Sequence, residues 1–135
     1  HARVMGPRHM GGWSRIAHGG IRSTILDETM GWAGIYLLEQ LTLTKSMTID
    51  FVKAVMVGEE LRCLAWVEER TGKREAIMKA ALYNADDEIS AESNGIFTML
   101  SLALARRIKM TDASFEKTFY DPLMACKHQV DARAR

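Results

Sequence analysis

The residues of this chain that could do chemistry lie at and just after a His-Gly-Gly run, where His18, Gly19 and Gly20 are followed by Asp27, nine residues after the histidine. Two glycines entering a helix would leave backbone N–H groups open to close approach, beside the partial positive charge of the helix N-terminus. Such a position suits a carbonyl oxygen that becomes an anion when its carbon is attacked. A carboxylate two turns into the helix can act as a general base for water or as a nucleophile.

The segment that follows is predicted to be a helix that the rest of the chain covers. Apolar side chains occupy most of the circumference of a helix drawn over about residues 20–40, so too little polar surface remains for an outer helix. At 1.5 Å per residue such a helix is about 30 Å long, close to the diameter of a small domain. The remaining sequence must therefore supply its cover.

One face of this helix consists of small residues around a single carboxylate. Spacings of three and four place on it Gly20, Ser23, Thr24, Asp27, Gly31 and Gly34. A glycine inside a helix costs about 1 kcal/mol relative to alanine, so the two later glycines indicate a close neighbour, whether backbone, partner subunit or ligand. Plain close packing, with Asp27 hydrogen-bonded to Ser23 or Thr24, explains the same pattern, and the helix alone does not separate the two interpretations.

Composition describes an ordinary globular domain. The 135 residues carry 18 basic and 17 acidic side chains and a formal net charge of +1, which gives no reason to expect nucleic-acid binding. Cys63 and Cys126 are isolated and lack metal-ligand spacing, so we expect reduced thiols, no metal and no cofactor. No apolar run reaches the roughly 20 residues of a membrane span, and no signal-peptide pattern is present. We therefore expect a cytoplasmic protein that does not enter a membrane.

Alternating apolar and polar residues predict four strands after the helix. We expect them over residues 41–51, from residue 61, over about 74–83 and over 88–100. The first would bury one side made of Leu41, Leu43, Met47, Ile49 and Phe51, which Lys45 alone interrupts. Short turns join the strands into an antiparallel meander that can curl around the helix, and open sheet edges favour pairing between two copies.

A single domain is expected over residues 1–135. Its core would cover about residues 1–110, because neither a repeat nor a linker-like composition interrupts the chain. A C-terminal appendage over about residues 111–135 comes after it, and the sequence does not indicate its role.

These features resemble the hotdog-fold acyl-CoA thioesterases, in particular the phenylacetate-pathway and 4-hydroxybenzoyl-CoA thioesterase branch. The likeness rests on the His-Gly-Gly run with Asp27 nine residues after the histidine, and on residues 48–61, which are similar to the strand, basic residue and Gly-Asp/Glu turn of that family. It covers roughly residues 11–100. The resemblance implies an α+β hotdog fold, an antiparallel β-sheet wrapped around a long central α-helix, and a homodimer or homotetramer with active sites at the dimer interface.

The resemblance also implies roles for individual residues in the hydrolysis of an acyl-CoA thioester to free acid and CoA. Asp27 would be the catalytic carboxylate, as general base or nucleophile, and the backbone N–H of Gly19 would polarise the thioester carbonyl. Further contacts with the substrate are expected from His18, Gly20, Thr44 and Trp13. Two alternatives stay open, namely Glu28 as the catalytic acid and His18 as a general acid instead of a turn residue that bonds the backbone.

The sequence departs from the family six residues before the histidine, where Gly12 replaces the usual Asn or Gln. The polar group that positions substrate or water would then come from His9, Ser14 or Thr44. Ala54 stands where a proline commonly follows the basic residue of the strand, which affects the bend of the strand and not the chemistry.

The resemblance raises two questions about the ligand. The basic side chains of Arg22, Lys45 and Lys53 could meet the phosphates of CoA, or each could be an ordinary solvated charge. A non-catalytic acyl-CoA-binding hotdog module is the main alternative function, and the presence of Asp27 favours the enzyme. A hotdog dehydratase or hydratase ranks below both, because the motifs of those enzymes are missing.

Overall fold

The computed structural model describes residues 1–5, 11–13 and 15–134, with the backbone alone for residues 5 and 11–13. Its elements in chain order are β1 (Ala2–Met5), β2 (Gly11–Trp13), β3 (Ile16–Ala17), α1 (Gly19–Leu38), β4 (Leu41–Phe51), β5 (Glu60–Arg70), β6 (Glu75–Tyr83), β7 (Ile89–Leu100), α2 (Leu102–Arg107), α3 (Ala113–Phe115), the π-helical turn η1 (Glu116–Tyr120) and α4 (Asp121–Arg133). The predicted helix and the four predicted strands are all present. The strands β5, β6 and β7 begin within one residue of where the alternation placed them.

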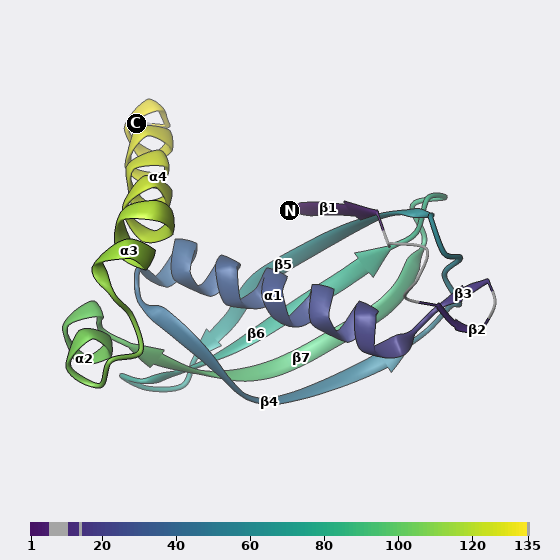
Figure 1. The fold of residues 1–135 in the computed structure, drawn as a ribbon, viewed down its shortest axis with the longest axis horizontal. Helices are drawn as coiled ribbons and strands as arrows, with labels where there is room; N and C mark the ends of the chain where they lie inside the picture. Colours follow the sequence, from purple (N-terminus) through teal and green to yellow (C-terminus); the bar gives the residue numbers. More distant parts are fainter. Residues whose placement is uncertain (6–10, 14, 135) are drawn as a thin grey trace.

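One antiparallel sheet organises the described residues. Its strand order is β1-β5-β6-β7-β4, and β2 pairs with β3 in a separate two-stranded ribbon. Figure 1 shows α1 lying across one face of this sheet, with β1 and β4 at the two edges. The predicted hotdog architecture, an antiparallel sheet around a long central helix, is confirmed.

The core lies between α1 and the sheet. Leu26 and Met30 of α1 are fully buried, together with Met78, Leu82 and Phe97 of the strands. Burying a side chain of this size contributes about 1.5–3 kcal/mol, which explains why a helix with glycines in its middle is stable here. Within the described ranges, no helix combines the length and apolar character that a membrane crossing would need.

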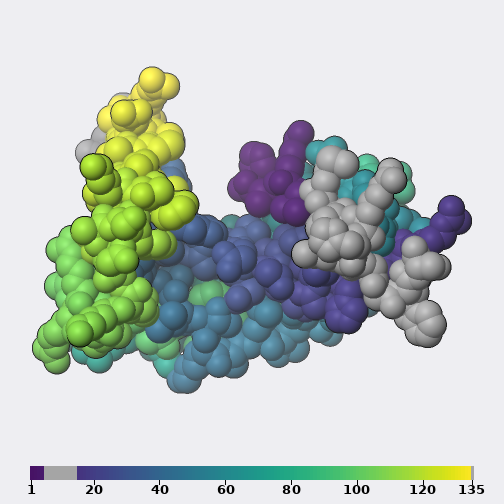
Figure 2. Space-filling model, viewed as in Figure 1, coloured from purple at the N-terminus to yellow at the C-terminus, as the bar shows by residue number. Residues whose placement is uncertain are grey.

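The sheet covers only one side of α1. Trp32 and Leu37, on the other side of the helix, are 38% and 46% exposed in this single chain. The C-terminal segment reaches that side only near the end of the helix, where it forms the upright column at the left of Figure 2. A hollow remains over α1 between this column and β1 (Figure 2).

The close neighbour that the helix glycines indicated is a side chain of β4. A Cβ atom on Gly34 would lie 2.8 Å from Cγ2 of Thr42, and the Thr42 hydroxyl donates a hydrogen bond of 3.0 Å to the carbonyl oxygen of Gly31. The glycines therefore let the first residues of β4 approach the helix closely. This contact fixes the strand that also carries Thr44.

The strand β4 contains a β-bulge at Lys45. Thr44 pairs with Phe97 and Ser46 pairs with Ile96, so one extra residue is inserted between them. An extra residue moves the following side chains to the other face of the sheet. Before the bulge Thr42 and Thr44 contact α1.

The residues beyond the bulge show the change of face. There Met47 and Ile49 pack against the core instead. The sequence-based placement of Leu43 and Phe51 on the buried side was wrong. The bulge reverses the alternation at Leu43, which is 46% exposed, and Phe51 at the end of the strand is 47% exposed.

The predicted C-terminal appendage is helical and contacts the end of α1. The helix ends at Leu38, and the cap residue Glu39 adopts a left-handed conformation with a φ of 56°. Lys127 donates hydrogen bonds to the carbonyl oxygen of Leu37 and to the carboxylate of Glu39, and the Tyr120 hydroxyl donates to the carbonyl oxygen of Glu39. A lysine at this place also balances the partial negative charge of the helix C-terminus.

Candidate functional site

The helix α1 begins with a side-chain cap from His18. Its Nδ1 accepts the backbone N–H of Gly20 at 2.9 Å, and its own carbonyl oxygen accepts the N–H of Ile21 at 3.0 Å. The structure thus places His18 as the turn residue that bonds the backbone, which is one of the two roles that the sequence left open. The N–H of Gly20 is already bonded to the imidazole and is not free to bind the substrate. The predicted substrate contact of Gly20 stays a prediction, and it would have to use another atom of this residue.

The N–H of Gly19 is the donor that this cap leaves available. No acceptor for it is found among the described residues. A Cβ atom on Gly19 would lie 3.4 Å from the ring of Phe51, so the last residue of β4 covers one side of the helix start. A side chain larger than alanine at position 19 would therefore press on this ring.

The carboxylate of Asp27 is bonded to Thr44 of β4. The Thr44 hydroxyl donates a hydrogen bond of 2.6 Å to Oδ1 of Asp27, which is half-buried. The Ser23 and Thr24 hydroxyls instead donate to the carbonyl oxygens of Gly19 and Gly20, four residues earlier. The alternative in which Asp27 is held by Ser23 or Thr24 is therefore wrong.

A cavity of about 210 Å³, which we call the Asp27 cavity, opens beside this pair. Its lining residues are Asp27, Glu28, Gly31, Trp32, Ile35, Thr42, Leu43, Thr44, Phe97 and Phe115. The residues from α1 form a row in which Asp27 comes first and Ile35 last, a distance of about 12 Å along the helix axis at 1.5 Å per residue. The polar pair is thus at one end of a mostly apolar cavity.

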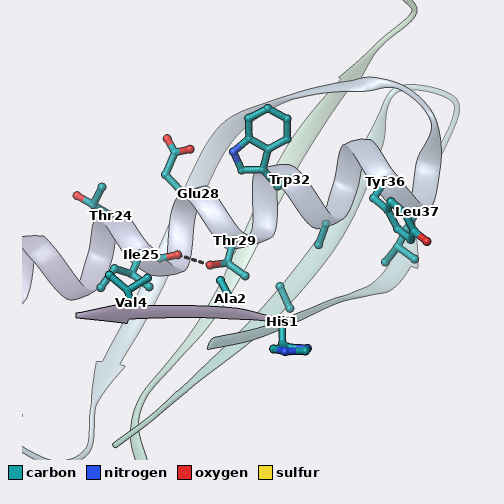
Figure 3. A pocket seen from close by; sticks show the side chains of 12 residues that line it. His1, Ala2, Val4, Thr24, Ile25, Glu28, Thr29, Trp32, Tyr36 and Leu37 are labelled. Carbon is teal, nitrogen blue, oxygen red and sulfur yellow. Dashed lines mark hydrogen bonds between the residues drawn. The ribbon is translucent and has the colours of Figure 1, made fainter. Parts of the chain in front are cut away.

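A larger cavity of about 760 Å³ lies between β1 and another side of α1. Figure 3 shows β1 alongside the helix, with Ala2 and Val4 facing Ile25 and Thr29. Its lining includes the exposed Glu28 and not Asp27. The carboxylate predicted from the sequence to be catalytic therefore does not line this larger cavity.

Three of the residues considered for the site have no side chain in the described part of the structure. Trp13 lies in β2, where its backbone pairs with Ile16, and its side chain is outside the described part of the structure. Of the three candidates for the polar group missing at Gly12, His9 and Ser14 are also outside the described residues. Thr44 is the candidate that the structure places beside Asp27.

The basic residues considered for CoA phosphates do not form a cluster. Lys45 pairs with Glu75, and Lys53 pairs with Glu88 at 2.6 Å. Arg22 is buried, donates to the carbonyl oxygen of Lys53 at 2.7 Å and lies 4.5 Å from the ring centroid of Phe51. Burial lowers the pKa of its guanidinium. Arg22 is therefore a structural residue that joins α1 to the end of β4.

Sequence reasoning missed the aromatic end of the Asp27 cavity. Trp32 stacks on Phe115 with ring centroids 6.4 Å apart, and both rings line the cavity. The spacing does not predict this position for Trp32, because a residue five positions after Asp27 lies about 140° around the helix axis from it. No local pattern connects Phe115 to this helix, since the two segments are far apart in the sequence.

Comparison with known proteins identifies the family. Residues 15–91 match the model of the thioesterase superfamily. The chain belongs to the thioesterase superfamily. The matched range includes the His-Gly-Gly run, Asp27 and Thr44, and it ends before the C-terminal segment that carries Phe115.

Solved structures of this superfamily share the fold. A Bacillus halodurans protein with CoA is 28% identical, with a TM-score of 0.66 over 73% of this chain and 69% of its own. The E. coli PaaI protein from the phenylacetic acid degradation operon is 19% identical, with a TM-score of 0.67 over 73% of this chain and 70% of its own. A hypothetical thioesterase from Streptococcus pneumoniae with coenzyme A is 16% identical, with a TM-score of 0.68 over 73% and 78%. No protein of curated function matches the chain.

Proposed function

We propose that this protein hydrolyses an acyl-CoA thioester to the free acid and CoA, with Asp27 as the catalytic carboxylate. The observation that carries the proposal is the hydrogen bond from Thr44 to Asp27 at the end of an apolar cavity, in a chain of the thioesterase superfamily. The presence of CoA in the Bacillus halodurans and Streptococcus pneumoniae structures supports CoA as the thiol part of the substrate.

The geometry suits Asp27 for proton abstraction or direct attack. Thr44 bonds Oδ1, which holds the carboxylate in one orientation and leaves Oδ2 for water or substrate. As a base, Asp27 takes a proton from water while the water oxygen adds to the thioester carbonyl carbon. The resulting oxyanion then collapses, the C–S bond breaks and CoA leaves as a thiolate. As a nucleophile, Asp27 would add to the carbonyl carbon and expel CoA as a thiolate, and water would then hydrolyse the mixed anhydride to the free acid and the Asp27 carboxylate.

The distance between Gly19 and Asp27 supports a site shared by two copies. They are eight residues apart on one helix, which is about 12 Å along its axis. One thioester carbonyl cannot accept a hydrogen bond from Gly19 and be attacked at Asp27 of the same chain across that distance. We therefore propose a homodimer in which Gly19 of one copy and Asp27 of the other serve the same substrate.

The edge strand β4 is the surface that we propose for this pairing. Among the described residues it has one neighbour in the sheet, β7, and no strand pairs with its other backbone edge. Leu43, Phe51, Val52 and Met56, on or just after this strand, are each exposed by more than 45%. Open strand edges with apolar side chains favour association with another strand.

A hydrolysis screen tests the proposed function. The purified protein is incubated with short, medium, long and aromatic acyl-CoAs, and thiol release is followed. We expect turnover of at least one class well above the buffer blank. Binding of acyl-CoA without turnover of any substrate would reject the enzyme and leave the acyl-CoA-binding module.

A further inference from the structure

The C-terminal segment contributes a wall to the Asp27 cavity. Asp27 and Thr44 lie at its first end, and Trp32 follows on α1 about 7.5 Å further along the helix axis. Phe115 is the lining residue that comes from outside the helix and the sheet. Its ring stacks on Trp32, with planes 24° apart, so Phe115 lines the cavity beside a residue that lies further along α1 than Asp27.

The position of Phe115 is fixed by the residues next to it. Its backbone N–H donates a hydrogen bond of 2.8 Å to Oδ1 of Asp112. The following residue, Glu116, is only 7% exposed, and its two carboxylate oxygens accept hydrogen bonds from Nε of Arg106 at 2.8 and 3.0 Å. Such a two-oxygen pair with arginine fixes orientation as well as distance. These hydrogen bonds fix the backbone that carries Phe115 at the cavity.

Phe119 gives a useful contrast within the same aromatic group. Its ring lies 6.1 Å from Trp32 and 5.6 Å from Phe115, between centroids, and it is 51% exposed. It contacts both partners yet does not line the Asp27 cavity. Phe115 lines the Asp27 cavity and Phe119 does not, so Phe119 serves as the matched control.

We infer that Phe115 sets the maximum length of the acyl group, so that the protein prefers short or aromatic acyl chains to long aliphatic ones; this rests on the proposed function. In the single chain the cavity is about 210 Å³, and Phe115 bounds it on the side of the C-terminal segment. Trp32, Phe97 and Phe115 give it aromatic surfaces, which suit an aromatic acyl group by stacking or edge contacts. The superfamily match ends at residue 91, so this wall belongs to a part of the chain outside that match.

The test compares Phe115→Ala with Phe119→Ala in the full chain. The value of kcat/KM is measured for butyryl-, phenylacetyl-, octanoyl- and dodecanoyl-CoA. Phe115→Ala should raise the ratio of octanoyl to butyryl hydrolysis by about tenfold or more, since pocket contacts of a few methylenes discriminate by this much. Phe119→Ala should leave the ratio within about twofold. An equal shift in both variants, or no shift in either, overturns the inference.

Two further variants keep the inference testable if Phe115→Ala does not fold. Phe115→Leu removes part of the ring and keeps an apolar side chain, and it should shift the ratio in the same direction by less. Phe115→Trp should shift it the opposite way by narrowing the cavity. Thermal unfolding of each variant shows whether it folds, and a ratio that moves the same way for the smaller and the larger side chain contradicts a length limit.

A binding measurement separates failure of this inference from failure of the proposed function. Affinities for non-hydrolysable thioether analogues of the same four acyl-CoAs are measured by calorimetry. If the parent hydrolyses nothing but Phe115→Ala gains affinity for the octanoyl analogue relative to the butyryl one, hydrolysis is wrong and the wall is supported. If the parent hydrolyses thioesters and neither turnover nor affinity changes its length preference in Phe115→Ala, the wall is wrong and the proposed function stands.

Discussion

The hydrogen bond from Thr44 makes the two oxygens of Asp27 unequal, and it gives the sharpest test at the scale of the residue. Asp27→Asn keeps the shape of the side chain and an oxygen that can accept the Thr44 bond, but it removes the charge and the basicity. We expect kcat to fall by about 100-fold or more, with the affinity for a non-hydrolysable acyl-CoA analogue within about tenfold of the parent. Thiol release and calorimetry provide the two numbers.

The matched control is Glu28→Gln on the neighbouring position. Glu28 is exposed and lines both cavities, yet no described side chain donates a hydrogen bond to it. We expect it to retain most of the turnover. Loss of activity in Glu28→Gln but not in Asp27→Asn would show that the acid on the other side of the helix does the chemistry.

At the scale of the element, the two mid-helix glycines predict opposite effects on stability. A Cβ atom on Gly31 has its nearest neighbour at 3.9 Å, whereas one on Gly34 would lie 2.8 Å from Thr42. Gly31→Ala should therefore raise the free energy of unfolding by about 0.5–1 kcal/mol. Gly34→Ala should lower it by about 1–3 kcal/mol, because Thr42 would have to move. Urea unfolding measures both, and stabilisation by Gly34→Ala would contradict the close approach of β4.

The C-terminal segment should detach in acid. Hydrogen bonds from Arg106 lower the pKa of Glu116, and those from Lys127 lower the pKa of Glu39, both below the ordinary glutamate value of 4.5. A carboxyl group whose pKa is lowered by folding stabilises the fold above its unfolded pKa and loses this contribution as the pH falls through its folded pKa. The contacts of η1 and α4 with α1 should thus weaken below about pH 4.5.

Fluorescence of Trp32 can report this detachment, because its ring contacts Phe115 and Phe119. The other two tryptophans are replaced by phenylalanine, and the emission is titrated from pH 7 to pH 3. Glu116→Gln should remove part of the transition, since glutamine does not titrate. An unchanged titration in that variant would mean that Arg106 and Glu116 do not couple the segment to pH. Asp112 and Asp121 also lie near this pair and are kept in all variants.

The sequence predicted the features that repeat within one helix or strand, and it did not predict contacts between segments that are far apart in the chain. Periodicity found α1 and the strands because each repeats a pattern within one element. The resemblance named Asp27 and Thr44 separately as site residues, but the hydrogen bond between them was not predicted, because two residues that are 17 positions apart have no local signature. The bulge at Lys45 appeared only as an interruption of the apolar side. The contact of Phe115 with Trp32 had no signal, since it depends on how four short C-terminal elements turn back onto the helix.

At the scale of the whole molecule, the shared site predicts that two inactive variants restore each other. Gly19→Val should place a branched side chain against Phe51 and beside the N–H proposed to bind the oxyanion, and turnover should fall by about 100-fold. When Gly19→Val and Asp27→Asn chains are co-expressed, each mixed dimer has one site with both residues intact. Random pairing then restores about a quarter of the parental activity.

The activity of the mixed dimers distinguishes a site shared by two chains from a site formed within one chain. If Gly19 and Asp27 of the same chain formed each site, no mixed dimer would contain an intact one, and the activity would stay at the level of the two variants. Light scattering on the parent gives an independent check, because a fully active monomer at micromolar concentration would also reject the shared site. Separate affinity tags on the two chains allow the mixed dimer to be isolated and assayed alone.

The bulge in β4 also determines which length changes this protein can tolerate. Lys45 is exposed and pairs with Glu75 at the surface, so Lys45→Ala should change the free energy of unfolding by no more than about 1 kcal/mol. Deleting the same residue would remove the reversal of faces, and either Thr42 and Thr44 would turn from the helix or Met47 and Ile49 would turn from the core. We expect the deletion to unfold the protein or abolish hydrolysis, as circular dichroism and thiol release would show. Across natural relatives, the spacing between Asp27 and its threonine should then vary only by insertions and deletions in the turn at residues 39–40, while the strand itself keeps its residue count.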